Sequence, residues 1–201
     1  QPNKILVIRF SSLGDLILTS PIFRELRRIF PGANLNLLTS VGFGDVLDNN
    51  PHLDRIIKHP RKENFEHLNQ LIEELQAEEF DLIYDAHRSM RSRWIVSRLT
   101  AFGMKRQLAV WKIDKRTLNR KLLIHLGWNR LQQGLSQREQ WLLPLKQHAP
   151  HGLDASTELF PDQKDIDLIE TLLSEHNLLP KGFIAIGPSA SQPLKCWPLL
   201  H

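Results

Sequence analysis

Short apolar runs alternate with longer amphipathic stretches along most of the chain. A short apolar, β-branched run between turn residues is typical of a strand that is buried on both faces of a parallel sheet. Such runs predict strands over residues 4–10, 35–39, 55–58, 80–85 and 105–110. Because helical patterns separate these runs, the expected fold class is α/β, with a doubly wound, Rossmann-like parallel sheet and the first strand at its centre.

Apolar residues that recur every three or four positions mark the predicted helices. In the first helix these include Ile22 and Leu26, with Ser20 placed to cap it and Pro21 at a first helical position. Trp128 and Trp141 are expected to be packing residues. The other predicted helices cover residues 41–47, 65–78, a segment after Ala86, most of 112–145 with breaks at Gly127 and Gly134, and 162–175.

The carboxyl-terminal part of the sequence is organised differently. Residues 146–161 are rich in Pro, His and Gly and have no period, which predicts a linker. Residues 183–187, FIAIG, predict a new buried strand. Since one strand and a loop cannot form a core, we expect most of a second domain to lie outside this sequence. The expected parts are a Rossmann-like domain over residues 1–145, a linker and helix over 146–180, and the start of a second domain over 181–201.

The composition is that of a folded globular protein, with 41% hydrophobic residues among 201. No apolar run approaches the roughly 20 residues that span a bilayer, and the amino terminus lacks a signal-peptide pattern, so we expect a cytoplasmic location. The single cysteine, Cys196, excludes an internal disulfide. Because the nine histidines lack the spacing of zinc-binding motifs, we expect no metal site.

Positive charge is concentrated in one region of the sequence. The net charge is +4, yet residues 86–121 contain eleven Lys and Arg and a single acid, Asp114. Arg88 and Arg91 directly follow a predicted strand, so we expect them at the carboxyl edge of the sheet. Such a segment predicts a binding face for an anionic ligand or surface. No nucleic-acid-binding motif accompanies it, so nucleic acid is not an expected partner.

The turn after the first predicted strand, residues 11–15 with the sequence SSLGD, is the main candidate for chemistry. In open α/β sheets ligands bind beyond the carboxyl ends of the strands. Ser11 and Ser12 offer hydroxyl groups, Gly14 permits close approach of the backbone, and Asp15 offers a carboxylate. A single glycine makes neither a dinucleotide fingerprint nor a P-loop. From the residues alone, Asp15 either caps the next helix or takes part in chemistry.

Two stretches resemble one family. The first thirty-odd residues, ILVIRFSSLGDLILTSPIFRELRRIFPGANLNLLT, are similar to the amino terminus of the family 9 glycosyltransferases, the bacterial ADP-heptose:lipopolysaccharide heptosyltransferases. The stretch IAIGPSASQPLKCWP is similar to the signature N-P-G-A-x-x-x-K-R-W-P that opens the carboxyl domain of those enzymes. The sequence departs from that signature at Ser189, where glycine is usual, and at Cys196, where arginine is usual.

The resemblance implies a GT-B architecture, in which an acceptor domain faces a donor domain that is largely absent here. It implies that Asp15 is the general base of an inverting single displacement, which moves heptose from ADP-heptose to the inner core of lipopolysaccharide. No cofactor is expected beyond this nucleotide sugar, and peripheral contact with the cytoplasmic face of the inner membrane is expected. The donor residues would be Ser189, Ala190, Ser191 and Lys195. The acceptor residues would be Ser11, Ser12, Gly14, Arg61, Arg88, Arg91, Arg120 and Lys121.

Two other functions compete with this interpretation. One is a non-enzymatic module that docks an anionic polymer through residues 86–121. The other is a different nucleotide-using Rossmann-like enzyme, such as a methyltransferase or dehydrogenase, which would need its cofactor at the first turn, where the glycine fingerprint is missing. If the chain is a heptosyltransferase part, we expect it to transfer little sugar by itself, because most donor contacts would lie outside it.

Overall fold

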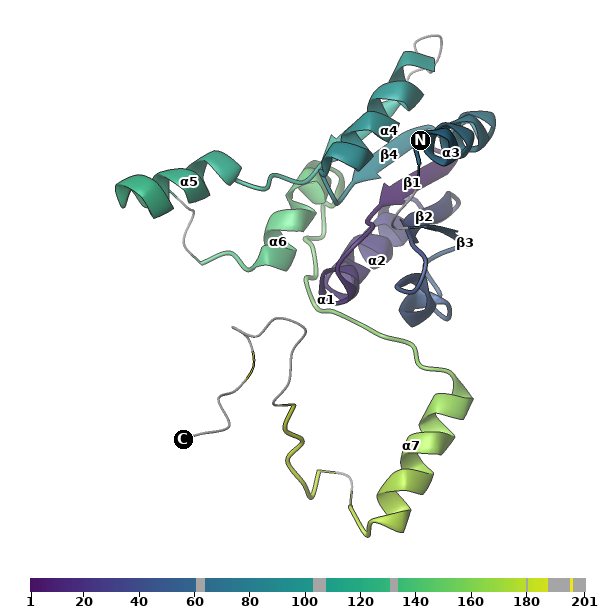
Figure 1. Cartoon of the computed structure of the whole chain (residues 1–201), viewed down its shortest axis with the longest axis vertical. Helices are drawn as coiled ribbons and strands as arrows, with labels where there is room; N and C mark the ends of the chain where they lie inside the picture. Colours follow the sequence, from purple (N-terminus) through teal and green to yellow (C-terminus); the bar gives the residue numbers. More distant parts are fainter. Residues whose placement is uncertain (61–63, 103–107, 131–133, 180, 188–195, 197–201) are drawn as a thin grey trace. The chain divides into compact units, whose positions relative to one another are not determined.

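The computed structural model of the chain describes residues 1–60, 64–102, 108–130, 134–179, 181–187 and 196 (Figure 1). It divides into two units, Gln1–Phe160 and Pro161–His201. The first unit holds the whole sheet and is described first.

Five parallel strands form the sheet in the order β3-β2-β1-β4-β5, which confirms the predicted doubly wound parallel sheet with the first strand at its centre. The strand order reverses on the two sides of β1. In this fold the crevice beyond the carboxyl ends of the strands at such a reversal is where ligands bind. The strands are β1 (Lys4–Ile8), β2 (Asn34–Ser40), β3 (Arg55–His59), β4 (Leu82–Asp85) and β5 (Ala109–Lys112).

Helices cover both faces of the sheet because successive residues of a buried strand point to opposite faces. Ile5 and Val7 of β1 belong to a core with α2, α6 and η3, whereas Leu6 and Ile8 belong to a core with α3 and α4. The helices are α1 (Leu13–Ile17), α2 (Ser20–Ile29), α3 (Phe65–Ala77), α4 (Met90–Phe102), α5 (Thr117–Leu126), α6 (Gln137–Leu142) and α7 (Gln163–Glu175), with 3-10 helices η1 (Gly44–Leu47) and η3 (Leu143–His148).

The last strand of the sheet differs from its prediction. The structure places β5 at Ala109–Lys112, and residues 105–107 of the predicted range lie outside the described residues. β5 lies at the edge of the sheet, where Val110 and Trp111 pack partly on opposite cores and both end residues of the strand are exposed. Trp111 pairs with Tyr84 in the sheet and stacks on His148 with ring centroids 4.5 Å apart.

The two tryptophans that were expected to pack behave differently. Trp141 is 5% exposed and belongs to the core, as predicted. Trp128 is 57% exposed, so the prediction for it is wrong. Gly127 ends α5 in the left-handed conformation, with φ of 67°, and the chain turns away there. The Trp128 ring instead meets the Arg130 guanidinium, 5.8 Å from the ring centroid.

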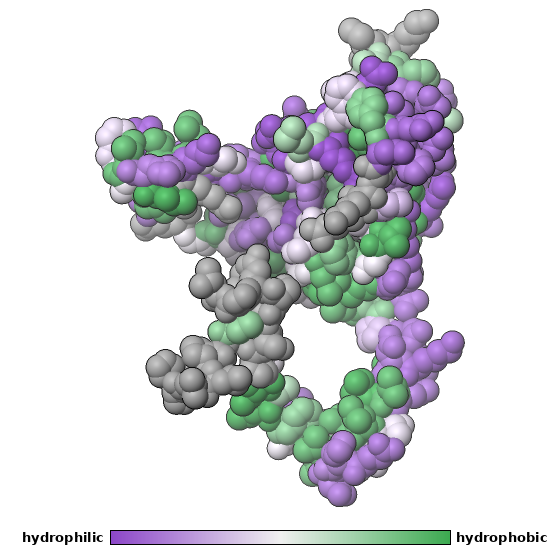
Figure 2. All heavy atoms as spheres, viewed as in Figure 1, coloured by the Kyte–Doolittle hydropathy of each residue, from purple (hydrophilic) through white to green (hydrophobic). Residues whose placement is uncertain are grey.

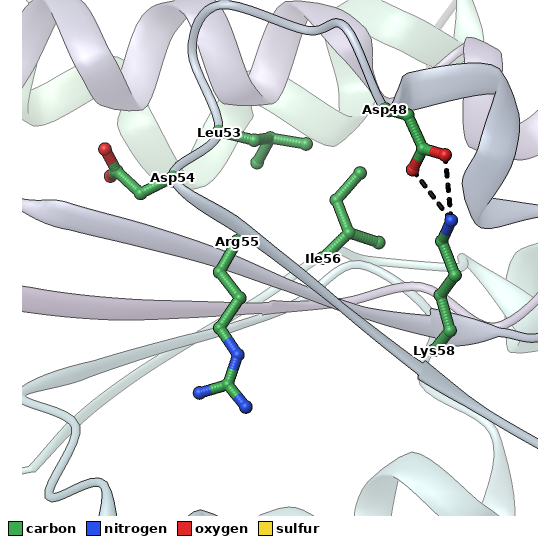
Figure 3. A pocket seen from close by; sticks show the side chains of 6 residues that line it. All are labelled: Asp48, Leu53, Asp54, Arg55, Ile56 and Lys58. Atoms are coloured by element: carbon green, nitrogen blue, oxygen red, sulfur yellow. Dashed lines mark hydrogen bonds and ion pairs between the residues drawn. The ribbon is translucent and has the colours of Figure 1, made fainter.

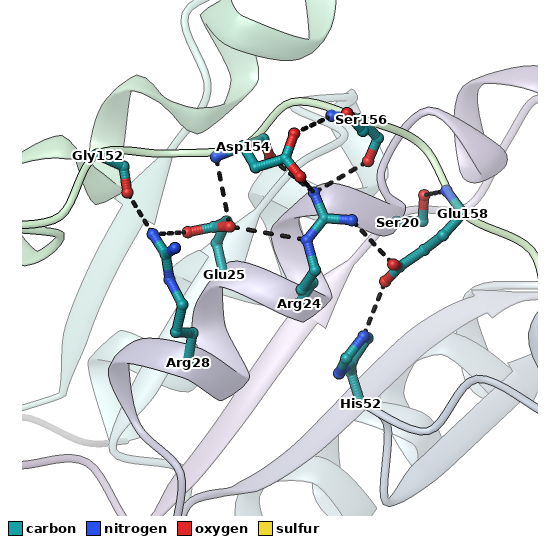
Figure 4. Close-up of polar contacts among 9 residues, drawn as sticks. All are labelled: Ser20, Arg24, Glu25, Arg28, His52, Gly152, Asp154, Ser156 and Glu158. Atoms are coloured by element: carbon teal, nitrogen blue, oxygen red, sulfur yellow. Dashed lines mark hydrogen bonds and ion pairs between the residues drawn. The ribbon is translucent and has the colours of Figure 1, made fainter.

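The segment predicted as a linker is held against α2 up to the end of the first unit (Figure 4). Arg24 donates to Glu158 at 2.9 Å, to the Asp154 carbonyl at 2.9 Å and to the Ser156 carbonyl at 3.1 Å. The buried Glu25 carboxylate accepts from the Asp154 backbone N–H at 3.4 Å. Polar side chains of one helix therefore add to the apolar contacts that Leu153 and Ala155 of this segment make with the core.

The second unit contains α7, for which Asp162 is the N-cap, in agreement with the predicted helix. The strand predicted over residues 183–187 does not form, since residues 181–187 have no strand structure. Ile184 and Ile186 are 88% and 81% exposed, and apolar residues of this unit are visible at its surface in Figure 2. A strand needs a neighbour for its backbone hydrogen bonds, and the described part of this unit offers none.

Candidate active site

Asp15 lies at the start of α1, just beyond the carboxyl end of β1. Its Oδ2 atom accepts from the backbone N–H of Ser12 at 3.4 Å and from the Ser12 hydroxyl at 3.3 Å, as the N3 residue of a capping box. The same oxygen pairs with Arg9 at 2.7 Å. Oδ1 receives no hydrogen bond from any described residue, and the side chain is 35% exposed. Asp15 therefore caps the helix and still presents one oxygen for chemistry.

Arg9, the partner of Asp15, was missed in the sequence analysis. Its side chain is only 6% exposed. One guanidinium nitrogen donates to the Ala86 carbonyl at 2.6 Å, and the group lies 4.6 Å from the Trp141 ring centroid. Burial lowers the pKa of Arg9, while the charge of Asp15 opposes that shift. A charged residue inside the otherwise apolar run ILVIRF is the signal that could have identified it.

The loop after β4 is folded around the buried carboxylate of Asp85. This group accepts from the backbone N–H groups of His87 at 3.0 Å and Arg88 at 2.7 Å, and from the Ser92 hydroxyl at 3.2 Å. Arg88 adopts a left-handed conformation, with φ of 49°. Such a conformation costs roughly 1–2 kcal/mol for a residue other than glycine. The hydrogen bonds to Asp85 offset that cost and fix where the basic helix α4 begins.

Arg88 and Arg91 lie at the carboxyl edge of the sheet, as predicted. Arg88 donates to the Ile113 carbonyl at 3.1 Å. Arg91 donates to the Pro60 carbonyl at 3.0 Å and lies 4.2 Å from the ring centroid of Phe10, which follows β1. Because β1 and β4 are neighbouring parallel strands, the turn with Asp15 and the loop with these arginines leave the sheet at the same edge.

His87 and Lys115 add two further titratable groups to this edge. Burial lowers the pKa of His87 to about 4, and the positive charges of Arg9, Lys115 and Arg91 add to the shift against the opposing charge of Asp15. Its ring lies edge-on to Phe10, with centroids 5.8 Å apart. Burial, and then the charge of Arg9, also lower the pKa of Lys115. His87 is therefore neutral near pH 7, and the cations around it repel one another.

The remaining predicted site residues are placed as follows. Ser11 is half-buried and Ser12 is the exposed N-cap of α1. A Cβ atom on Gly14 would meet nothing within 4 Å, so open space lies over its backbone. Lys121 is exposed on α5 and makes no hydrogen bond or ion pair with a described residue. The following lie outside the described residues: Arg61, Ser189, Ala190, Ser191, Lys195 and the side chain of Arg120.

A separate pocket of about 370 Å³ lies beside the edge strand β3 (Figure 3). Lys58 lines it and pairs with Asp45 at 2.7 Å and Asp48 at 2.8 Å, and these partners raise the pKa of Lys58. No predicted site residue lines this pocket, and its second cation, Arg55, is also paired, with Glu78 at 2.7 Å. We therefore place the candidate site at the carboxyl edge between β1 and β4.

The described residues contain neither a cluster of metal-binding side chains nor a membrane-spanning helix. No group of three or more His, Cys, Asp or Glu is placed to hold a metal ion there. No helix in that part of the chain has the length and apolar character needed to cross a membrane.

Known proteins similar in sequence are heptosyltransferases. No protein-family model matches the chain. Lipopolysaccharide heptosyltransferase 3 of Escherichia coli is 27% identical over 207 residues, which cover 92% of this chain and 54% of that protein. Lipopolysaccharide heptosyltransferase 1 of Pseudomonas aeruginosa is 25% identical over 166 residues, covering 75% of this chain and 46% of that protein. The chain thus spans about half the length of the curated relatives it matches.

A similar solved structure supports the fold. The glycosyltransferase family 9 protein from Veillonella parvula superposes with a TM-score of 0.68 at 19% identity, over 98% of this chain and 56% of that one. Its fold agrees with the expected GT-B type, of which this chain contains the parallel sheet and its helices. Taken together, the chain is similar in sequence to lipopolysaccharide heptosyltransferases and shares its fold with a glycosyltransferase family 9 protein.

Proposed function

We propose that this chain forms the acceptor side of a glycosyltransferase that moves heptose from ADP-heptose to the inner core of lipopolysaccharide. The observation that carries the proposal is how the two carboxylate oxygens of Asp15 are held beyond the carboxyl end of β1. One of its oxygens is held by Ser12 and Arg9, and the other receives no hydrogen bond from the described residues. A carboxylate that is fixed in this way suits a general base.

The proposed reaction is a single displacement with inversion at the sugar. Asp15 takes the proton from an acceptor hydroxyl as the hydroxyl oxygen attacks the anomeric carbon. The new C–O bond forms while the bond from that carbon to the diphosphate oxygen breaks, and ADP leaves with the electron pair. By residue match to the family, Lys195 would stabilise the leaving diphosphate, together with Ser189, Ala190 and Ser191. The proposal uses no metal and no organic cofactor.

The acceptor would be held by the basic edge next to Asp15. Arg88 and Arg91 present guanidinium groups, whose planar donors suit phosphates and carboxylates. Lys115 lies close enough to Arg88 for the two charges to interact, and it makes no hydrogen bond or ion pair with a described residue, so its charge is available for an anionic ligand. We propose that Arg61, Arg120 and Lys121 extend this surface. An acceptor of this kind would bring the protein to the cytoplasmic face of the inner membrane.

The test is a transfer assay with the protein at its natural length, ADP-heptose and a deep-rough lipopolysaccharide acceptor. We expect transfer by the wild type, no effect of EDTA, and a fall in kcat of about 100-fold or more for Asp15→Asn, the range typical of a lost general base. Asp54→Asn is the matched control, because Asp54 also pairs with an arginine, Arg27, at 2.6 Å. It should keep wild-type kcat.

Two results would contradict the proposal. An Asp15→Asn protein about as active as the wild type would exclude the general base. A folded wild type that transfers nothing, but binds a DNA duplex with an affinity that falls steeply and linearly with log salt, would favour the module that docks an anionic polymer.

A further inference from the structure

We propose that Arg9 is a positioning residue for the reaction: it holds Oδ2 of Asp15 so that Oδ1 is left to accept the proton of the acceptor hydroxyl. This inference rests on the proposed function. Arg9 does not itself touch the reacting atoms in this scheme. It acts through Asp15, and its effect should therefore depend on the presence of the Asp15 carboxylate.

The Arg9 guanidinium is fixed from three sides. One nitrogen pairs with Asp15 at 2.7 Å, and another donates to the Ala86 carbonyl at 2.6 Å. The Trp141 ring covers the group, with its centroid 4.6 Å away. The backbone is fixed too, since the Arg9 N–H donates to the Leu38 carbonyl at 2.9 Å and continues the ladder between β1 and β2. These contacts leave only 6% of the side chain exposed.

A helix cap alone does not account for this arrangement. Ser12 already satisfies the capping box of α1, because its backbone N–H and its hydroxyl both face Asp15. A buried cation is costly unless it is paired and hydrogen-bonded. The Nε of Arg9 is buried and has no hydrogen-bond partner among the described residues, so the fold leaves part of that cost uncompensated. What the chain gains is a carboxylate with one fixed orientation.

Arginine suits this position better than lysine would. Its planar group donates in two directions at once, here to the end of β4 and to α1, whereas a lysine ammonium is a point charge on a flexible stem. Trp141, whose ring covers the Arg9 guanidinium, is itself fixed, since its backbone carbonyl accepts a hydrogen bond from the hydroxyl of Tyr84 in β4. The orientation of Asp15 is thereby tied to the sheet on one side and to α6 on the other.

The experiment compares Arg9→Met, Arg9→Lys, Asp15→Asn and the Arg9→Met/Asp15→Asn double variant, at the natural length of the protein. For Arg9→Met we expect kcat to fall about 100-fold, the loss that a misplaced catalytic group causes. The KM for ADP-heptose should stay within about threefold, because no donor contact changes. In the Asp15→Asn background the same substitution should lower kcat by less than about threefold.

Arg27→Met is the matched control. Arg27 also forms an ion pair, with Asp54 at 2.6 Å, and donates to the Ala33 and His52 carbonyls, but it lies away from the candidate site. We expect it to lower thermal stability and to leave kcat within about twofold of the wild type, as expected for a substitution far from the chemistry. If Arg9→Met does not fold, Arg9→Lys takes its place in the test. Lysine keeps the positive charge, but kcat should fall about tenfold because an ammonium group lacks the planar donors of the guanidinium.

The outcomes separate this inference from the proposed function. If Asp15→Asn is inactive but Arg9→Lys and every folded Arg9 variant keep wild-type kcat, the positioning role is wrong and the general base stands. If the effect of Arg9→Met is as large in the Asp15→Asn background as in the wild type, Arg9 acts on the fold and not through Asp15. If Asp15→Asn keeps full activity, the proposed mechanism itself fails.

Discussion

Ile8 of β1 pairs directly with Asp85 of β4 in the centre of the parallel sheet. Both strands end at this pair of residues, so the turn that carries Asp15 and the loop that carries Arg88 start from adjacent positions. The electrostatics agree, since His87 in that loop is affected by the charges of both Asp15 and Arg91. One register pair therefore brings a carboxylate and a group of cations to the same edge.

Replacing Asp85 should destabilise the fold. Asp85→Ala removes the acceptor of the backbone N–H groups of His87 and Arg88 at a buried position, and it leaves the Ser92 hydroxyl with only the Ser89 carbonyl. We expect a loss of about 2–4 kcal/mol in the free energy of unfolding, measured by urea denaturation. The control is Asp114→Ala, which removes one exposed hydrogen bond to the Arg116 N–H and should cost less than about 1 kcal/mol. Equal losses in the two variants would contradict the role of Asp85.

His87 should make stability fall as the solution becomes acidic. Its pKa in the folded chain is about 4, below its ordinary value of 6.5. The unfolded chain therefore binds a proton that the folded chain does not, and the stabilisation present above pH 6.5 is lost as the pH falls toward 4. Allowing for solvent screening, we expect the wild type to lose about 1 kcal/mol more than His87→Gln between pH 7 and pH 5. Parallel pH profiles of urea unfolding would contradict this.

The ion pairs and hydrogen bonds of Arg24, Glu25 and Arg28 on α2 should stabilise the position of residues 152–158, near the end of the first unit. Glu25 is buried between Arg24 and Arg28, pairing with Arg28 at 2.6 Å (Figure 4). Glu25→Gln removes the charge that these arginines face, and we expect a loss of about 1–3 kcal/mol in the free energy of unfolding. The segment around Asp154 should also be cleaved faster in limited proteolysis. Glu73→Gln, an exposed site on α3, is the control and should change neither measurement.

Gly14→Ala should separate folding from ligand binding. The added Cβ would meet nothing within 4 Å, and Gly14 lies in α1 without a positive φ, so stability should be unchanged or slightly higher. If the acceptor approaches this backbone, the methyl group should raise its KM about tenfold, since it occupies space that the ligand needs. Gly32→Ala is the matched control, because a Cβ there also meets nothing. An unchanged KM for Gly14→Ala would remove this glycine from the acceptor site.

Much of the fold could be predicted because buried strands have continuous apolar sequences. The run that became β1 is apolar on both faces, which is why a central position was predicted for it. The edge strand β5 was misplaced, and its residues are exposed or only partly buried. The predicted strand at residues 183–187 has the right sequence, but it has no described neighbour to receive its hydrogen bonds. Whether these two segments form strands, and over which residues, depends on the strand they pair with, and a local sequence pattern does not show that partner.

The candidate site could be predicted only in part. Parallel topology sufficed to put Asp15, Arg88 and Arg91 at one edge, because the carboxyl ends of parallel strands meet there. The contact between Arg9 and Asp15 could not be predicted, since it depends on how tightly α1 turns back over the end of β1. Lys115 was counted only as one of many charges. Its position among cations depends on the register of β5, which the sequence analysis had placed wrongly.

Lys115 should affect stability and acceptor binding in opposite directions. Burial and the nearby charge of Arg9 lower its pKa, so its charged form is less stable in the folded chain than in the unfolded chain at pH 7. Lys115→Met should therefore leave the free energy of unfolding unchanged or raise it, by no more than about 1 kcal/mol because the group is partly exposed.

The same substitution should weaken binding of an anionic acceptor. We expect the acceptor KM to rise about tenfold at low salt, and the difference from the wild type to shrink as salt screens the lost charge. Lys112→Met, an exposed lysine on β5, is the control and should change neither stability nor KM. A Lys115→Met protein that loses stability and keeps its acceptor KM would mean that this lysine supports the fold. In that case the anionic ligand would have to be held by Arg88 and Arg91, without Lys115.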